Sequence, residues 1–395
     1  MEWHEELHER VDERIEQLDE RLWAVATALH ERPELSYEEH AAAERLTGEL
    51  AADGFAVDTG VAGLPTAFLA RAGSGRPCVA LLLEYDALPG LGHACGHNLI
   101  AAAGLGAALS ARDVLADSPG SLLVVGCPAE ERGGGKVALA EAGVFDDVDA
   151  ALTFHPGVHS WSSAPLTAQV ELKVTFHGRA AHPTGNPEAG VDALAALIQA
   201  FGAVSALRQR LPAGSHVQGI ITHGGEATNI VPDHAEGRFG LRALTTTALD
   251  RLAEDVGTCA QGAALATGAK VDVERLGRGF AHFRDNAVLS ERFTEHLAAC
   301  GIHATPPVPG VFPGSSDIGD VSARVPAIHP FVAITAEEYA VHTEEFAAAS
   351  ASPRGRSVML ASAAALARTA IDLRTHHALV SRAWDHFRSL ERNGH

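Results

Sequence analysis

The stretch CVALLLEYDALPGLGHACGHN, residues 78–98, decides the fold class of this 395-residue chain. Its first eight residues form a nearly continuous apolar run, typical of a strand buried on both faces of a parallel or mixed sheet. The side chains that follow are of types that bind metals: Glu84, Asp86, His93, Cys95 and His97. Because ligands of an open α/β sheet bind beyond the carboxyl ends of its strands, this segment predicts a strand that ends at a binding site.

Two later strands are expected to end in the same kind of side chain. The apolar segment SLLVVGCPAEE carries Glu130 and Glu131 at its end, and DAALTFHP carries His155. Helical patterns at residues 101–116 and 136–148 alternate with these segments. The alternation predicts an α/β core with a mixed sheet, in which the polar strand ends converge on one site.

The hydrophobic pattern of the sequence changes near residue 166. From there to about residue 281, alternating strand-like segments and two helical segments predict a small α+β domain of the ferredoxin-like kind. After this segment, the pattern of the first 165 residues returns and continues to the C-terminus. We therefore expect a catalytic domain formed by residues 1–165 and 282–395, with residues 166–281 inserted as a second domain.

Composition narrows the classes of partner. The chain has 30 basic and 50 acidic residues and a formal net charge of −20, which argues against binding nucleic acid or an anionic membrane surface. No apolar run reaches the ~18–20 residues of a membrane span, and the acidic N-terminal segment does not resemble a signal peptide. The five cysteines are widely spaced and odd in number, so no disulfide framework is expected. These features predict a cytoplasmic protein.

The donor types at the strand ends fit a transition-metal site. Imidazole, thiolate and carboxylate groups suit zinc, manganese, cobalt or nickel. The Cys95-Gly96-His97 spacing lets two donors reach neighbouring positions, and a thiolate can bridge two cations. In the adjacent pair Glu130-Glu131, one carboxylate could bind metal while the other acts as a general base.

Each of these signals also has an ordinary structural explanation when taken alone. A Cys-x-His pair often has no metal role, and a Glu-Glu pair usually belongs to a solvated helix start. A single histidine after a strand is often a loop residue. The metal interpretation depends on all of these residues falling at strand ends in one half of one sheet.

Several segments together resemble the amidohydrolases of metallopeptidase clan MH: EYDALPGLGHACGHNLIAAAG, CPAEERGGGK, ALTFHPG, TNIVPD, GSSDIGDVS and VHTEEF. The resemblance covers nearly the whole chain and is strongest to the branch that contains aminobenzoyl-glutamate hydrolases and dipeptidases of the β-alanyl-lysine type. It implies a zinc-peptidase-like catalytic domain with an inserted lid and dimerisation domain. It also implies hydrolysis of the amide bond of an N-acyl amino acid, an aminobenzoyl-glutamate-like compound or a dipeptide.

The resemblance implies roles for individual residues. Two divalent metal ions are expected on five ligands: Cys95, His97, Glu131, His155 and His342. Glu130 matches the general base, and Asp86 matches an aspartate that orients a metal ligand. In the inserted domain, His182 matches a histidine that stabilises the oxyanion, often in the partner subunit's site of a homodimer. Four further residues match groups near the substrate carboxylate: Asn229, Arg242, Gly314 and Ser315.

Two positions depart from common family patterns. Many relatives carry His-x-Asp or Asp-x-Asp on the first strand, where this chain has Glu84-Tyr85-Asp86, and Asn98 stands where auxin-conjugate hydrolases have Asp. Both changes fit the aminobenzoyl-glutamate and dipeptidase branch, and they leave open whether Glu84 contacts metal. Two other functions remain as alternatives: a deaminase or amidase acting on a small aromatic or heterocyclic substrate, and a non-catalytic metal- or peptide-binding protein.

Overall fold

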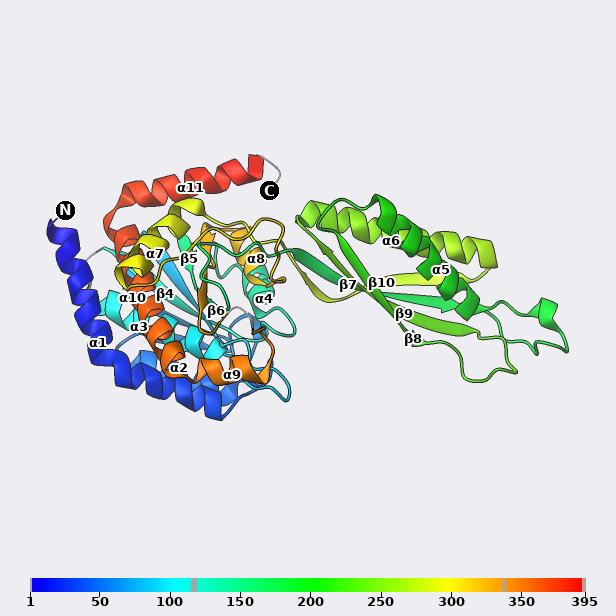
Figure 1. The fold of residues 1–395 in the computed structure, drawn as a ribbon, viewed down its shortest axis with the longest axis horizontal. Helices are drawn as coiled ribbons and strands as arrows, with labels where there is room; N and C mark the ends of the chain where they lie inside the picture. Colours follow the sequence, from blue (N-terminus) through cyan, green and yellow to red (C-terminus); the bar gives the residue numbers. More distant parts are fainter. Residues whose placement is uncertain (1, 115–118, 337–338, 393–395) are drawn as a thin grey trace. The chain divides into compact units, whose positions relative to one another are not determined.

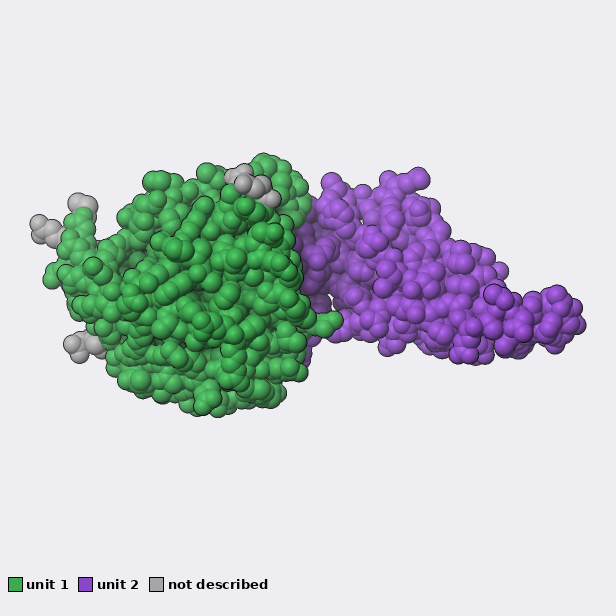
Figure 2. All heavy atoms as spheres, turned by 60° about the horizontal axis from the view of Figure 1, so that its bottom comes forward, with its two compact units in different colours: residues 1–165, 283–313, 317–395 green, residues 166–282, 314–316 purple. Residues whose placement is uncertain are grey.

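The computed structural model describes residues 2–114, 119–336 and 339–392. The chain divides into two compact units (Figure 2). Unit 1 comprises residues 1–165, 283–313 and 317–395, and unit 2 comprises residues 166–282 and 314–316. The assignment of unit 1 as a catalytic domain and unit 2 as a lid and dimerisation domain stays a prediction.

Unit 1 is built around a mixed sheet with helices packed on it (Figure 1). Its described strands are β1 (Ala56–Thr59), β2 (Phe68–Ser74), β3 (Cys78–Glu84), β4 (Gly120–Cys127), β5 (Ala150–Leu152), β6 (His155–Gly157), β11 (Ala327–Ile328) and β12 (Phe331–Ala333). Its described α-helices are α1 (Glu2–Glu31), α2 (His40–Ala52), α3 (His97–Val114), α4 (Gly135–Glu141), α7 (Ala287–Ala299), α8 (Ile318–Ser322), α9 (Glu344–Ser350), α10 (Pro353–Thr375) and α11 (His377–Arg392). The main sheet has the order β1-β2-β4-β3-β5-β11, and β12 pairs with β6 separately.

Strand β3 lies in the interior of the main sheet and pairs in parallel with both β4 and β5. Every residue of β3 is buried, as expected for a strand covered on both faces. Its last residue, Glu84, lies opposite Cys127, the last residue of β4. Parallel pairing therefore brings the carboxyl ends of these strands to one edge of the sheet, and the loops that follow begin at neighbouring points.

The helix that follows the loop after β3 packs directly on the sheet. Helix α3 contacts β3, and α1 and α10 pack against α3 to form a helical layer with a continuous apolar core. The small residues of α3 permit this close approach, because a Cβ on Gly104 would lie 2.6 Å from Leu83 Cδ1. In the part of the chain that the structure describes, no helix combines the length and apolar character needed to cross a membrane.

Two expected elements of unit 1 differ from the structure. The segment 149–156, expected as one strand, forms β5 and β6 instead, because the chain leaves the main sheet and pairs with β12 from His155 onward. The helix expected at 136–148 ends at Glu141. Gly143 takes a φ of 79°, the left-handed conformation that commonly ends a helix.

Unit 2 has a four-stranded antiparallel sheet with two helices packed against it. In chain order its main elements are β7 (Ala168–His177), α5 (Ala193–Leu207), β8 (His216–His223), β9 (His234–Ala243), α6 (Thr246–Thr267) and β10 (Lys270–Phe280). The sheet order β10-β7-β9-β8 with this element order is the ferredoxin-like arrangement. Asp192 begins α5 by accepting a hydrogen bond from the Ala195 N–H at 2.9 Å, and Thr245 caps α6 in the same way.

Candidate metal centre

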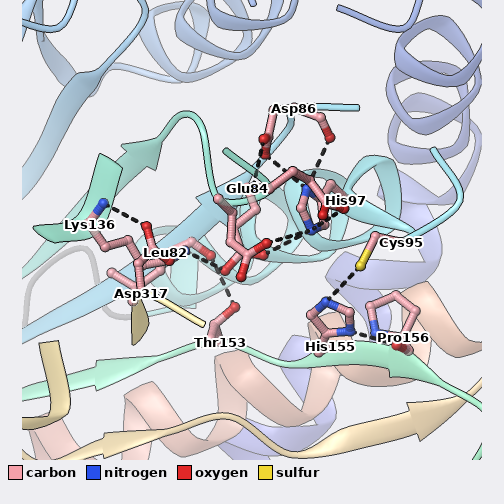
Figure 3. Close-up of polar contacts among 12 residues, drawn as sticks. Leu82, Glu84, Asp86, Cys95, His97, Lys136, Thr153, His155, Pro156 and Asp317 are labelled. Carbon is pink, nitrogen blue, oxygen red and sulfur yellow. Dashed lines mark hydrogen bonds and ion pairs between the residues drawn. The ribbon is translucent and has the colours of Figure 1, made fainter. Parts of the chain in front are cut away.

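The loop between β3 and α3 places Cys95 and His97 next to one another (Figure 3). His97 is the first residue of α3, and Gly96 before it has a φ of 80°. A Cβ on Gly96 would lie 2.8 Å from Pro156 Cγ, so the backbone conformation and the close contact both require glycine. The Cys-Gly-His order therefore lets the thiol and the imidazole share one buried site.

Asp86 orients His97 within this site. Nδ1 of His97 lies 3.0 Å from Asp86 Oδ1 and 3.0 Å from the Asp86 carbonyl oxygen. Both partners are acceptors, so Nδ1 of the neutral ring carries the proton and Nε2 presents its lone pair. Asp86 also accepts hydrogen bonds from Ser36 Oγ at 2.8 Å and from the Glu131 N–H at 3.0 Å. Although burial opposes its charge, the hydrogen bond from His97 holds the pKa of Asp86 below its ordinary value.

Ligand-type side chains from four loops or strand ends gather at this site: Cys95, His97, Glu130, Glu131, His155 and His342. They form three overlapping groups of three, in each of which the ligand atoms all lie within 4.8 Å of one another. Cys95 is shared by the groups that contain His155 and His342, whereas the loop residue His93 belongs to none of the groups found among the described residues. Ligands shared between groups suit a pair of neighbouring cations.

The separations between these atoms match ligands on a common cation. Bonds of ~2.3 Å to sulfur and ~2.0–2.1 Å to nitrogen place two tetrahedral ligands about 3.5 Å apart. Cys95 Sγ lies 3.5 Å from His155 Nε2 (Figure 3). His342 Nε2 lies 3.6 Å from Glu131 Oε2.

His155 and His342 reach the site from distant parts of the chain. Nδ1 of His155 lies 2.6 Å from the Pro156 carbonyl oxygen, which leaves Nε2 directed at Cys95. Burial, together with the charge of His329, lowers the pKa of His155 to about 3, so its ring is neutral and able to bind metal. His342 precedes α9 with a left-handed φ of 64°, and its N–H donates to the Ala94 carbonyl oxygen at 2.9 Å. This hydrogen bond joins the C-terminal loop to the GHACGHN loop.

A tight turn carries Glu130 and Glu131 from the end of β4 to α4. Ala129 has a φ of 58° although it is not glycine, and its N–H donates to Glu39 Oε1 at 2.8 Å. Such backbone strain costs about 1–3 kcal/mol and is common at functional sites. A Cβ on Gly135 would lie 1.9 Å from the Pro128 carbonyl oxygen, so this turn closes only with glycine.

The electrostatic environment favours protonation of two members of the centre, Glu130 and His97. Burial and the negative charges of Glu84 and Asp317 raise the pKa of Glu130 well above its ordinary value. Burial opposes a charge on His97, yet its acidic partner Asp86 raises the pKa of this ring well above the ordinary value. Protons and cations therefore compete for the same buried atoms, as metal ligands do in general.

Several buried polar atoms at the centre have no hydrogen-bond partner. Among the described residues these include Nε2 of His97, Oε1 of Glu131 and Oε2 of Glu84. An unpaired buried polar group costs about 1–3 kcal/mol and is rare in folded proteins. Unpaired atoms on three separate elements, all close to one another, fit a site built for cations.

Sequence reasoning did not single out three buried residues beside this centre. Lys136 Nζ lies 2.8 Å from Glu84 Oε1 and 2.5 Å from Asp317 Oδ1 (Figure 3). The ring of His329 lies 5.3 Å from that of His155, and within the described chain neither of its nitrogens has a hydrogen-bond partner. The one local signal was Lys136 itself, since the sequence contains only three lysines and this one follows three glycines.

The remaining expected site residues belong to unit 2. Nδ1 of His182 accepts hydrogen bonds from the Thr184 N–H at 3.3 Å and the Gly185 N–H at 3.1 Å. These contacts place the proton of the neutral ring on Nε2 and make that atom a donor. Asn229 lies exposed in the loop between β8 and β9.

Unit 2 also brings together the three other expected substrate-binding residues. Arg242 Nη1 donates to Ser315 Oγ at 3.0 Å, and Ser315 Oγ lies 2.8 Å from Thr167 Oγ1. The Gly314 carbonyl oxygen accepts from the Thr167 N–H at 2.9 Å. Burial lowers the pKa of Arg242, and the side-chain partner that its guanidinium contacts is the neutral hydroxyl group of Ser315.

Comparison with known proteins identifies the family. Peptidase family M20/M25/M40 matches residues 81–365. The chain belongs to this family. It is 39% identical over 381 residues to the Xaa-Arg dipeptidase of Mus musculus. This match covers 92% of this chain and 87% of that protein. It is 33% identical over 318 residues to a p-aminobenzoyl-glutamate hydrolase chain of Escherichia coli strain K12, with coverage of 75% and 66% respectively. The predicted resemblance to this branch is confirmed.

Solved structures share the fold at low sequence identity. An aminobenzoyl-glutamate utilization protein from Klebsiella pneumoniae has a TM-score of 0.71 and 22% identity, covering 92% of this chain and 98% of its own. A dinuclear metal binding peptidase of the M20 family from Bacillus subtilis has a TM-score of 0.68 and 22% identity, covering 91% and 99%. The expected fold class is thereby confirmed. Membership of the M20 family, with relatives of this kind, makes the chain a metal-dependent hydrolase of amide or dipeptide bonds.

Proposed function

We propose that the centre around Cys95 and His97 binds two divalent cations and hydrolyses a dipeptide or an N-acyl amino acid. The observation that carries this proposal is the overlap of the ligand groups, in which Cys95 and Glu131 each belong to two. Cys95 would bind with His97 and His155 on one side and with Glu131 and His342 on the other. The mixed sulfur, nitrogen and oxygen donors suit zinc, manganese, cobalt or nickel.

Glu130 is proposed as the general acid and base. When bound, the two cations would polarise the scissile carbonyl group and activate a water molecule. Glu130 accepts the proton of the attacking water and delivers it to the leaving amine. The burial of Glu130 beside the negative charges of Glu84 and Asp317, which raises its pKa, supports this role because it favours uptake of a proton by the carboxylate. Asp86 serves as a positioning residue that keeps Nε2 of His97 turned toward the centre.

Residues of unit 2 are proposed to bind the substrate and its transition state. His182 would donate from Nε2 to the oxyanion, which its hydrogen-bonded Nδ1 supports. Arg242 would pair with the substrate carboxylate, and its neutral hydroxyl partner leaves its charge uncompensated. Three residues would complete the carboxylate site: Asn229, Gly314 and Ser315.

The leaving group is proposed to be an amino acid with a free carboxylate. The names of two relatives specify an Xaa-Arg dipeptide and p-aminobenzoyl-glutamate, in both of which an amide joins an amino acid to an acyl group. Release of an amino acid also distinguishes this proposal from a deaminase, which would release ammonia.

A homodimer through unit 2 is the proposed assembly. Strand β8 is an edge strand whose Ile220 and Ile221 are 59% and 47% exposed, and Ile198 on α5 is 56% exposed. Exposed edge strands with large apolar side chains favour pairing with another chain. Light scattering of the wild type and of Ile220→Lys tests this, with a dimer expected for the first and a monomer for the second.

The proposed compartment is the cytoplasm. All five cysteines are free, including Cys95 at the centre. A thiol that must bind metal is best preserved under the reducing conditions of that compartment.

The test uses the full chain with zinc, manganese, cobalt or nickel. Metal content is measured after dialysis, and each form is then incubated with Xaa-Arg and other dipeptides, N-acyl amino acids and p-aminobenzoyl-glutamate. Two ions per chain and release of an amino acid from at least one compound are expected, with the activity lost in a chelator. Release of ammonia without an amino acid, or hydrolysis that is insensitive to metal removal, would contradict the proposal.

A further inference from the structure

A fully buried lysine lies directly behind the metal centre. Lys136 on α4 has no exposed side-chain surface, and neither have its partners Glu84 and Asp317. Asp317 binds this residue twice, because its Oδ1 lies 2.5 Å from Nζ and its Oδ2 accepts the backbone N–H of Lys136 at 2.9 Å. Burying an ammonium group costs several kcal/mol unless it is paired, so this lysine is held in place by its carboxylate partners.

The charges in this group of three do not balance. Two carboxylates, Glu84 and Asp317, face a single ammonium group. A purely structural buried ion pair is neutral, since an excess charge in a medium of low dielectric constant is costly. Asp317 directs both of its oxygens at Lys136, whereas Glu84 directs only Oε1 there. The excess negative charge therefore lies on Glu84 beside His97, where either a proton on that ring or a bound cation would balance it.

The second oxygen of Glu84 faces the metal centre. Oε2 lies 3.4 Å from His97 Nε2, and in the described chain neither atom has a hydrogen-bond partner (Figure 3). Two ligands bound at ~2.1 Å to a tetrahedral cation lie about 3.4 Å apart. The distance between Oε2 and Nε2, the lack of a hydrogen-bond partner for either atom and the excess negative charge on Glu84 are all expected if a cation binds to both atoms.

We propose that Lys136 and Asp317 position Glu84 as an additional ligand of the cation bound by His97. This inference rests on the proposed metal centre and extends it to a residue at the carboxyl end of β3. Lys136 draws Oε1 of Glu84 away from the centre, which fixes the carboxylate so that Oε2 alone points at the cation. Lys136 and Asp317 touch neither substrate nor cation, and they act through Glu84.

The experiment compares the metal affinity of the wild type with that of Glu84→Gln and of the double variant Lys136→Met/Asp317→Asn. The double variant removes Lys136 and Asp317 together, so neither of these two charges is left without the other, and it frees Oε1 of Glu84 from its ammonium partner. Glu84→Gln is expected to weaken binding of one of two zinc ions by more than 10-fold, and the double variant by about 10- to 100-fold, the range typical of residues that orient ligands. Titration against a coloured zinc chelator measures both.

Cobalt spectra separate ligation from a general effect on folding. Visible absorption of bound Co²⁺ reports its ligand set, so Glu84→Gln is expected to change the spectrum. The matched control is Asp149→Asn. Asp149 is a buried carboxylate whose Oδ2 accepts the N–H of Cys78 at 2.7 Å, so it contacts the first residue of β3, whereas Glu84 is the last. This control is expected to keep the spectrum and the zinc affinity of the wild type.

The possible outcomes distinguish this inference from the proposed function. Two ions bound by Glu84→Gln with wild-type affinity and an unchanged cobalt spectrum would overturn the role of Glu84. Weaker binding by Glu84→Gln together with wild-type binding by the double variant would overturn the role of Lys136 and Asp317. In either case the proposed function stands if the wild type binds two ions and releases an amino acid. A wild type that binds no metal refutes both.

Discussion

Two clusters of histidine and carboxylate side chains in unit 1 are alike in composition but differ in how their atoms are paired. One is the metal centre. The other, here called the helix-junction cluster, consists of His8 on α1, His296 on α7 and Asp372 on α10, and its ligand atoms also lie within 4.8 Å of one another. His8 Nε2 and His296 Nε2 lie 2.9 and 2.7 Å from the two oxygens of Asp372, and Arg292 Nε lies 2.6 Å from Oδ2.

The hydrogen-bond pairing of the buried atoms distinguishes a cluster that is suited to bind a cation from one that is not. In the helix-junction cluster the arginine neutralises the aspartate, and within the described residues no buried side-chain nitrogen or oxygen of the three members lacks a hydrogen-bond partner. In the metal centre His97, Glu131 and Glu84 each leave a buried atom unpaired. Residue types alone would therefore suggest a metal site at both clusters. The unpaired atoms favour cation binding at the proposed metal centre, and the complete pairing favours a joint between helices at the helix-junction cluster.

The largest expected effect is the loss of hydrolysis in Glu130→Gln. Removal of a general acid and base is expected to lower the rate of hydrolysis by about 10²- to 10⁴-fold, because the side-chain amide of the introduced glutamine cannot take the proton of the attacking water. Metal content should stay at the wild-type value. The matched change in the other cluster, His296→Gln, is expected to keep the rate of the wild type once folding is verified. Full activity of Glu130→Gln would remove this residue from the mechanism.

Asp372→Asn is expected to lower the free energy of unfolding by about 3 kcal/mol, because it removes the buried negative charge and one of the two acceptor oxygens shared by Arg292 and two histidines. Burial opposes the charge of Asp372, but the hydrogen bonds from His296 and His8 hold its pKa below the ordinary value. The folded state therefore binds fewer protons than the unfolded one at acidic pH. The stabilising contribution is complete above the ordinary aspartate pKa of ~3.9 and is lost as the pH falls below it.

Urea unfolding of wild type and Asp372→Asn between pH 3 and pH 7 measures this contribution. The difference between the two proteins is expected to shrink as the pH falls. A constant difference over the whole range would show that the charge of Asp372 is not what joins the helices.

Metal removal is expected to destabilise the protein through the metal centre alone. A cation at about 100 times its dissociation constant adds about 2.7 kcal/mol per site to the stability of a protein that binds it only when folded. Thermal unfolding with and without chelator should show this difference in the wild type and in His296→Ala. In Cys95→Ala the difference should fall sharply, because Cys95 belongs to two of the ligand groups. An equal response in all three proteins would contradict the site assignment.

The smallest expected effect is that of His8→Ala. His8 supplies one of the three donors to Asp372, and its side chain is 16% exposed, so water can replace part of the contact. A loss of about 0.5–1.5 kcal/mol in unfolding free energy is expected. The neighbouring exposed residue Glu9 provides the control, since Glu9→Ala should change stability by less than ~0.5 kcal/mol. Equal effects of the two changes would remove His8 from the helix-junction cluster.

Local sequence pattern was sufficient for those parts of the centre that follow buried strands. Cys95, His97, Glu130 and Glu131 come after continuous apolar runs, and parallel pairing brings such ends to one edge. The same pattern predicted the ferredoxin-like unit, because alternating burial and helical spacing are local properties. His342 could be expected only from the family resemblance, since its loop reaches the centre by tertiary contact with Ala94.

The pairing of Lys136 was beyond the reach of sequence reasoning for a physical reason. A lysine at the start of a helical segment is ordinarily solvated, and nothing near it in the sequence indicates that Asp317 will lie against it. The break between β5 and β6 was missed for a similar reason, because the partner strand β12 lies far along the chain. Which buried atoms remain unpaired is a property of the folded chain, so the contrast between the two clusters also required the structure.

The most direct test of that contrast is the number of ions bound per chain. Wild type, His97→Ala and His296→Ala are stripped of metal, titrated with zinc and analysed by native mass spectrometry. The account predicts two ions for the wild type and for His296→Ala, and fewer than two for His97→Ala. A third ion that disappears in His296→Ala, or two ions retained by His97→Ala, would contradict it.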